Sequence, residues 1–160
     1  MQNIKIVIGL GNPDIEYEKT YHNVGHIFID STKEELRIKN KELLKTAVFM
    51  NKSGLFVKEV FKKEKAKPEQ LLIVHDDSDI ELGRFKFSFG RNSAGHKGVQ
   101  NIINQLKTKN FWRLRIGIRP SRNKDKADEL VLKKITPARM KELESVFKLA
   151  IKQMAGGKTV

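Results

Sequence analysis

The sequence contains no cysteine, which excludes a disulfide-stabilised fold and any metal site with thiolate ligands. This absence is compatible with a reducing compartment, and we expect a cytoplasmic protein. The sequence also lacks an uninterrupted apolar run of membrane-spanning length, so we expect no signal peptide, no transmembrane helix and no membrane partner. A length of 160 residues suits a single domain with its own core, which we place at residues 1–160.

Acidic residues are scarce relative to basic ones. Nineteen Asp and Glu stand against thirty-two Lys and Arg, which gives a formal net charge of +13 and an isoelectric point near 9.9. Residues 97–126 alone hold nine Lys or Arg and a single acid, Asp125. This concentration favours a nucleic-acid partner, although an ordinary solvated basic surface would give the same total.

Apolar stretches alternate between strand-like and helix-like spacing along the chain. Strands are predicted at residues 4–10, 45–50, 71–74, 83–89 and 114–118, the fourth of them near a sheet edge. Helices are predicted at residues 24–36, 55–66 and 99–106, and from the N-cap Thr136 to Gly156. Residues 37–44 and 121–128 are predicted as polar connections. The pattern predicts a single-domain three-layer α/β sandwich, with a twisted, mixed, mostly parallel sheet flanked by helices.

Residues 9–26, GLGNPDIEYEKTYHNVGH, follow the first predicted strand and concentrate glycine, amide and imidazole side chains. They are not a dinucleotide fingerprint, because Asp14 stands where its third glycine is needed, and no Gly-Lys-Ser/Thr follows to make a P-loop. Ligands of open α/β sheets collect at the carboxyl ends of strands, so Asn12 and His22 are candidates for one site. A glycine-rich turn with a surface histidine is the alternative interpretation.

Polar side chains also follow two further predicted strands, at Asn51 and at His75–Asp76. If the three strands are neighbours, these residues share a crevice with Asn12 and His22. A histidine beside a carboxylate can activate water, and asparagine amides can stabilise an oxyanion. No serine lies in a nucleophile-elbow context, so direct attack by water is favoured over a covalent route.

A metal site is the competing hypothesis for these residues. Two of the histidines, His22 and His26, have the i, i+4 spacing that two ligands on one helix face need. However, no acid lies between them, as a zincin motif requires, and His22 is expected to precede the helix. We therefore expect no metal at the four histidines, which are His22, His26, His75 and His96.

Five segments, in order, resemble the signature segments of bacterial-type peptidyl-tRNA hydrolases: GLGNPDIEYEKTYHNVG, FMNKSG, LLIVHDDSDIELG, RNSAGHKGV and FWRLRIGIRP. Together they span most of the chain, and five ordered motifs are more specific than any one of them. The resemblance implies a monomeric, cofactor-free enzyme that hydrolyses the ester between a peptide, or an N-blocked amino acid, and the 3′ ribose of tRNA. Such an enzyme recycles tRNA from abandoned translation and binds the acceptor stem and 3′ end of its substrate.

The resemblance also assigns roles to individual residues. His22 resembles the catalytic base of the family, and Asp76 the carboxylate that hydrogen-bonds it. Asn12 resembles the residue that distinguishes blocked from free aminoacyl groups. Asn51 resembles the amide that positions the substrate carbonyl.

Three further residues, Tyr17, Phe49 and Met50, resemble the walls around the tRNA 3′ end and the first peptide residue. The basic stretch after Lys97 is where the family would meet the acceptor-stem phosphates. The loop at residues 95–98 departs from the family, because it reads Gly-His-Lys-Gly where Gly-His-Asn-Gly is usual. Lys97 keeps a hydrogen-bond donor, loses the acceptor and adds a charge. We interpret it as a contact to a phosphate of the tRNA end, or as a like charge that repels protonated His22.

A second departure is a shortened segment between Arg37 and Lys45, which predicts a smaller sheet than the family has. The alternative function is a non-hydrolytic RNA-binding protein, like the splicing-factor relative within the same family. Retention of the base and its acid argues against that alternative, whereas the change at Lys97 argues mildly for it. The remaining candidates are interpreted as structural: His75 beneath the site, His96 as a loop hydrogen-bonder and Trp112 in the core.

Overall fold

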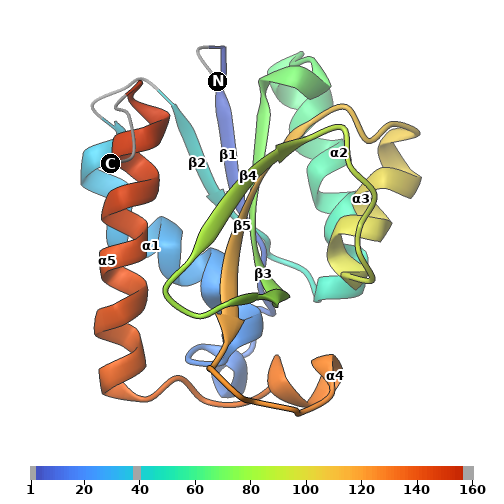
Figure 1. Ribbon diagram of the computed structural model, residues 1–160. Helices are drawn as coiled ribbons and strands as arrows, with labels where there is room; N and C mark the ends of the chain where they lie inside the picture. The colour runs from blue at the N-terminus through green and yellow to red at the C-terminus, as the bar shows by residue number, and fades with distance from the viewer. Residues whose placement is uncertain (1–2, 38–40, 157–160) are drawn as a thin grey trace.

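The computed structural model describes residues 3–37 and 41–156, which form one five-stranded sheet in the order β2-β1-β3-β5-β4 (Figure 1). Neighbouring strands are parallel except for the antiparallel pair β4–β5, which places β4 at an edge. The mixed, mostly parallel α/β sheet predicted from the sequence is thereby confirmed. The strands are β1 (Ile6–Gly9), β2 (Glu42–Lys45), β3 (Leu71–Glu81), β4 (Phe85–Phe89) and β5 (Trp112–Arg119).

Helices cover both faces of the sheet, as the three-layer prediction requires. Helices α1 (Val24–Arg37) and α5 (Pro137–Met154) lie on one face, and α2 (Ser53–Glu64) and α3 (Lys97–Leu106) lie on the other (Figure 1). Alternate side chains of β3 lie on opposite faces of the sheet and pack against different helices. Leu72 and Val74 pack in the cluster that contains α1 and α5, whereas Leu71 and Ile73 pack with α2 and α3.

The terminal helix begins as predicted. The Thr136 hydroxyl oxygen accepts a hydrogen bond from the Arg139 backbone N–H at 3.3 Å, and Pro137 occupies the first turn. Gly156 follows the helix with a φ of 88°, a left-handed conformation that glycine adopts without strain. Within the described residues, no helix is long and apolar enough to cross a membrane.

The second strand lies at Glu42–Lys45, so its prediction at residues 45–50 was wrong, and part of the predicted connection is strand. The connection's residues 38–40 lie outside the described part of the chain. The residues after β2 leave the sheet because their polar groups bind the loop after β1. The Thr46 hydroxyl accepts from the Gly11 N–H at 3.1 Å and donates to the Gly11 carbonyl at 3.0 Å. That a smaller sheet than the family's results from the shortened segment stays a prediction.

Strand β3 extends through Glu81 and does not end at Val74 as predicted. Its ladder with β5 continues because Asp76 and Asp77 pair with Ile116 and Gly117. Asp76 is therefore held within a strand and not on a flexible loop. The predicted loop at residues 121–128 was also partly wrong, because a short helix, α4 (Ala127–Leu130), begins inside it.

Candidate active site

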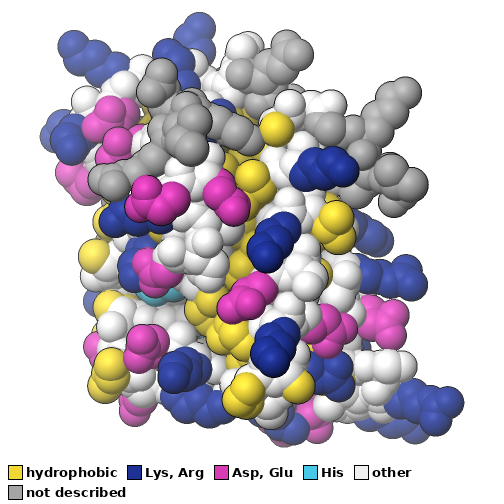
Figure 2. All heavy atoms as spheres, turned by 90° about the vertical axis from the view of Figure 1, so that its left-hand side faces the viewer, with side chains coloured by type: hydrophobic (Ala, Val, Ile, Leu, Met, Phe, Trp, Pro, Cys, Tyr) yellow, Lys and Arg dark blue, Asp and Glu magenta, His cyan; other side chains and the backbone are white. Residues whose placement is uncertain are grey.

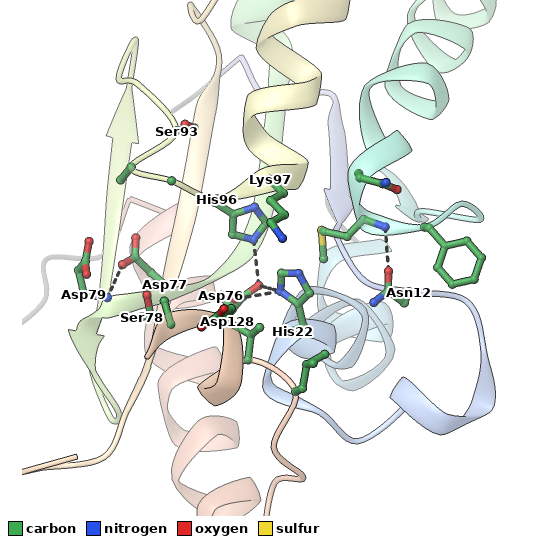
Figure 3. A pocket seen from close by; sticks show the side chains of 18 of the residues that line it. Asn12, His22, Asp76, Asp77, Ser78, Asp79, Ser93, His96, Lys97 and Asp128 are labelled. Atoms are coloured by element: carbon green, nitrogen blue, oxygen red, sulfur yellow. Dashed lines mark hydrogen bonds and ion pairs between the residues drawn. The ribbon is translucent and has the colours of Figure 1, made fainter. Parts of the chain in front are cut away.

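A cavity of about 790 Å³ lies between the carboxyl-terminal part of the sheet, the starts of α2 and α3, and the α4 segment (Figure 3). The structure brings together the four predicted catalytic residues, because Asn12, His22, Asn51 and Asp76 all line this cavity. Three of the predicted substrate-binding residues also line it: Phe49, Met50 and Lys97. Tyr17 is outside this lining, and its role stays a prediction.

His22 and Asp76 form the central pair of the cavity. The imidazole Nδ1 of His22 lies 3.0 Å and 3.1 Å from the two carboxylate oxygens of Asp76. An ionised carboxylate can only accept, so Nδ1 carries the proton and the lone pair is on Nε2. No described residue hydrogen-bonds that Nε2, so it is available to take a proton from a water molecule in the cavity.

Asp76 is buried, and burial alone would raise the pKa of its carboxyl group. The His96 and His22 imidazoles outweigh that effect and hold the pKa of Asp76 well below its ordinary value. The contact with His96 runs from its Nε2 to Asp76 Oδ1, at 3.0 Å. Two imidazoles therefore share one ionised carboxylate. The sequence had suggested that His96 only hydrogen-bonds within its loop, whereas it also binds Asp76.

The trio His22, Asp76 and His96 has the spacing of a possible metal site, since one ligand atom from each lies within 4.8 Å of the others. A metal needs a lone pair from each imidazole at that point. His96 offers none, because its Nδ1 already accepts the Val99 backbone N–H at 3.2 Å, which leaves the proton on Nε2. These donors suit a hydrogen-bonded cluster and do not fit a metal centre.

The two remaining histidines point elsewhere. His75 is buried and donates from Nδ1 to the Asp76 carbonyl at 2.6 Å, and burial keeps its pKa well below the ordinary value. His26 Nε2 lies 3.0 Å from the Thr46 hydroxyl, and burial lowers its pKa to about 4. His22 and His26 therefore have different partners, and the i, i+4 spacing noted in the sequence does not form a site.

Asn12 is fixed in orientation by its neighbours. Its backbone N–H donates to Asn23 Oδ1 at 2.8 Å, and Asn23 Nδ2 donates back to the Asn12 carbonyl at 2.9 Å. Its own side-chain oxygen accepts the Met50 backbone N–H at 2.8 Å. The amide nitrogen of Asn12 hydrogen-bonds no described residue, so Asn12 can only donate into the cavity. Asn23 was not predicted, and its place directly after His22 was the one available signal.

The α4 segment, which comprises helix α4 and the residues that follow it up to 133, closes the cavity on the side of His22, and no local pattern in the sequence indicated it. The His22 backbone N–H donates to the Val131 carbonyl at 2.8 Å, and Tyr21 N–H donates to the Lys133 carbonyl at 3.1 Å. Val131 and Leu132 line the cavity, and Leu132 is 53% exposed. The segment thus fixes the backbone that carries His22 and adds an apolar wall.

The basic stretch at residues 97–126 divides into structural and surface residues. Arg113 is buried, Arg115 pairs with Asp77 at 2.7 Å, and Arg119 donates to the Ser78 carbonyl at 2.6 Å. Of the nine basic residues of this stretch, Lys97 alone lines the cavity. On the face that carries α1 and α5, acidic side chains lie among the basic ones (Figure 2). The net charge therefore overstates the number of cations available to a ligand at the cavity.

Comparisons with known proteins identify the family of the chain. A family model described as peptidyl-tRNA hydrolase matches residues 6–156. Peptidyl-tRNA hydrolases of Aquifex aeolicus and Mycoplasma capricolum are 38% and 40% identical, over 94% and 90% of this chain and 88% and 87% of theirs. The crystal structure of peptidyl-tRNA hydrolase from Acinetobacter baumannii is 29% identical with a TM-score of 0.85, over 97% of this chain and 88% of that one. The matched span includes every residue that lines the cavity, and the chain belongs to the peptidyl-tRNA hydrolase family.

Proposed function

We propose that this protein hydrolyses the ester between a peptide, or an N-blocked amino acid, and the 3′ ribose of tRNA, using a water molecule activated by His22. The observation that carries the proposal is the orientation of His22, whose Nδ1 is held by Asp76 at 3.0 Å while Nε2 faces the cavity with no hydrogen bond to a described residue. Relatives that match most of the chain are named for this activity. The product would be tRNA that is free for reuse in translation.

In this mechanism the water gives its proton to His22 Nε2 as its oxygen bonds to the ester carbonyl carbon. Asp76 stays ionised and stabilises the imidazolium that forms. The tetrahedral intermediate then expels the 3′ oxygen of the ribose, which takes the proton back from His22. One water is consumed, and the products are a peptide carboxylic acid, which ionises, and a tRNA 3′-hydroxyl.

The serines of the cavity support direct attack by water. The Ser93 hydroxyl donates a hydrogen bond to Gln100 Oε1 at 2.8 Å, and neither it nor Ser78 hydrogen-bonds His22. A covalent route needs a serine that the base can deprotonate. Among the described residues His22 has no such partner.

Asn51 is suited to the ester carbonyl. It lies in the short turn before α2, it is exposed at the cavity, and its side chain hydrogen-bonds no other described residue. Its N–H groups are therefore free to donate to the carbonyl oxygen as that oxygen gains negative charge. Removing one donor of this kind typically lowers a rate by about 10²- to 10³-fold.

Asn12 is suited to the N-blocking group, because it presents only N–H donors. An N-acyl group offers a carbonyl oxygen that accepts from such a donor. A free aminoacyl group offers an ammonium, which has donors and no acceptor. This complementarity explains how one side chain distinguishes blocked from free aminoacyl-tRNA.

Replacing Asn12 by aspartate should lower kcat/KM for N-acetyl-aminoacyl-tRNA by about tenfold to a hundredfold, because a carboxylate repels the acyl oxygen. Aspartate still accepts the Met50 N–H, so the midpoint of thermal unfolding should stay close to that of the parent. Steady-state kinetics and thermal melts of both proteins check this prediction. An unchanged preference for blocked over free substrate in the variant would contradict the role of Asn12.

Lys97 is the proposed contact for a phosphate of the tRNA 3′ end. A Lys97→Asn variant should bind tRNA more weakly, and the slope of log affinity against log salt should fall by about 1. Lys148→Asn is a matched control, because Lys148 is exposed on α5, lies outside the basic stretch at residues 97–126 and does not line the cavity. Equal salt slopes for the two variants would remove Lys97 from the interface.

Contact with the acceptor stem, a monomeric state and a cytoplasmic location are further parts of the proposal.

The proposed function is tested by measuring release of free tRNA from N-acetyl-aminoacyl-tRNA and from unblocked aminoacyl-tRNA, each with and without a chelator. We expect hydrolysis of the blocked ester, little hydrolysis of the free one and no effect of the chelator. Salt-sensitive tRNA binding without hydrolysis would instead identify a non-catalytic RNA-binding relative. Loss of activity with the chelator would show that a metal acts at the site.

A further inference from the structure

His96 links the start of α3 to the acid of the catalytic pair, and both of its ring nitrogens are engaged. Nδ1 accepts the Val99 backbone N–H at 3.2 Å, which makes His96 the N-cap of the helix. Nε2 lies 3.0 Å from Asp76 Oδ1. The side chain is 8% exposed, so water competes little for either contact.

These two contacts fix the tautomer of His96. A backbone N–H can only donate, so Nδ1 must hold a lone pair, and the ionised Asp76 can only accept, so Nε2 must carry the proton. The neighbouring rings restrain the imidazole further. His75 packs against it edge-on with ring centroids 4.6 Å apart, and the His22 ring lies 5.3 Å away. Protonation of His96 at Nδ1 would break the helix cap, so His96 serves as a neutral donor and not as a second base.

The contact with His96 also restrains the Asp76 carboxylate. Asp76 Oδ1 receives hydrogen bonds from both His96 and His22, whereas Oδ2 receives one from His22 alone. The carboxylate is thus held from two sides, by α3 and by the turn before α1 (Figure 3). Without the bond from α3 it could rotate about its own side chain and carry the His22 ring with it.

We propose that His96 is a positioning residue for hydrolysis, because its neutral Nε2–H fixes the orientation of Asp76, and through Asp76 that of His22. This inference rests on the proposed function. His96 acts through Asp76 and takes no proton from water or substrate. Because Gly95 and Lys97 line the cavity on either side of it, the same turn that bounds the substrate also holds the acid.

Two variants separate the two contacts of His96. Asparagine is a strong N-cap and can accept the Val99 N–H, but it is too short to reach Asp76. Glutamine is long enough to donate to Asp76 but is a poor N-cap. We expect His96→Asn to melt near the parent temperature while kcat falls about tenfold to a hundredfold with little change in KM. We expect His96→Gln to melt several degrees lower and to retain more of the parent kcat.

The pH profile and a double-mutant cycle give readouts that a purely structural role would not move. Loss of one hydrogen bond concentrates negative charge on Asp76, which then holds the imidazolium of His22 more tightly. The acid limb of the kcat/KM profile of His96→Asn should therefore move to higher pH. In an Asp76→Asn background, His96→Asn should cause little further loss, because both changes remove the same restraint.

Three results would overturn the inference while the parent hydrolyses its substrate. They are a parent-like kcat and pH profile in His96→Asn, losses in both variants that follow their melting temperatures, and full additivity with Asp76→Asn. An independent readout is the nitrogen NMR spectrum of the His96 ring, which should show a protonated Nε2 and a bare Nδ1; the opposite tautomer would also overturn it. A parent protein that does not hydrolyse the ester would instead refute the proposed function.

Discussion

Replacing His22 by alanine should lower kcat for hydrolysis of N-acetyl-aminoacyl-tRNA by about 10²- to 10⁴-fold, because the cavity then has no free imidazole nitrogen to take the proton from water. No other histidine can substitute. His96 has both ring nitrogens engaged, and His75 and His26 do not line the cavity. The fold should persist, since His22 lies in a turn and its ring is not part of either hydrophobic cluster.

Single-turnover rates and circular dichroism spectra of parent and variant test this expectation. His26→Asn is a matched control. It removes an imidazole that lies only four residues after His22, and the partner of that imidazole is Thr46, outside the cavity. Its rate per folded molecule should equal that of the parent. A His22→Ala protein that keeps more than about a tenth of the parent rate would exclude His22 as the base.

Replacing Asp76 by asparagine should have an effect of similar size, a fall in kcat of about 10²- to 10⁴-fold. The amide has a donor where the carboxylate had only acceptors, so it can turn its N–H toward His22 Nδ1. That contact favours the tautomer with the proton on Nε2, which cannot accept a proton from water. The neutral amide also gives no electrostatic stabilisation to the imidazolium.

Asp79→Asn is the control for this change. Asp79 belongs to the same strand and lines the same cavity, and no described histidine contacts it. Its kcat should be close to the parent value. If Asp76→Asn and Asp79→Asn had equal rates, Asp76 would act only through the general charge of the cavity and not through His22.

Much of the site could be predicted because its residues follow directly on local signals. Asn12 and His22 lie in one glycine-rich exit from β1, and Asp76 continues the most apolar strand of the chain. Parallel strands bring their carboxyl ends together, so these residues converge whatever the details of the loops. The terminal helix was equally accessible, since Thr136 and Pro137 mark its start.

The errors arise where distant contacts override local patterns. The apolar run at residues 45–50 predicts a strand, but Thr46 binds Gly11, thirty-five residues away, and draws the chain out of the sheet. The strand prediction for β3 stopped at its first polar residues, whereas Asp76 and Asp77 are buried because partners from other elements satisfy them.

The roles of His96 and of the basic stretch were hidden for the same reason. Nothing local to His96 indicates that Asp76, twenty residues earlier, accepts a hydrogen bond from its ring. A count of charges likewise does not reveal that Arg115 pairs with Asp77 or that Arg119 holds the Ser78 carbonyl. Sequence spacing identifies which side chains can do chemistry, whereas their partners depend on the assembled sheet.

The most direct test of the central claim is a single turnover of N-acetyl-aminoacyl-tRNA in ¹⁸O-labelled water, with mass spectrometry of both products and of the quenched protein. Attack by a water molecule activated by His22 predicts one labelled oxygen in the released N-acetyl-amino acid, no label in the tRNA and an unmodified protein mass at all times. A protein carrying the acyl group during turnover, or label in the 3′-hydroxyl of the tRNA, would contradict direct attack of water on the ester carbonyl.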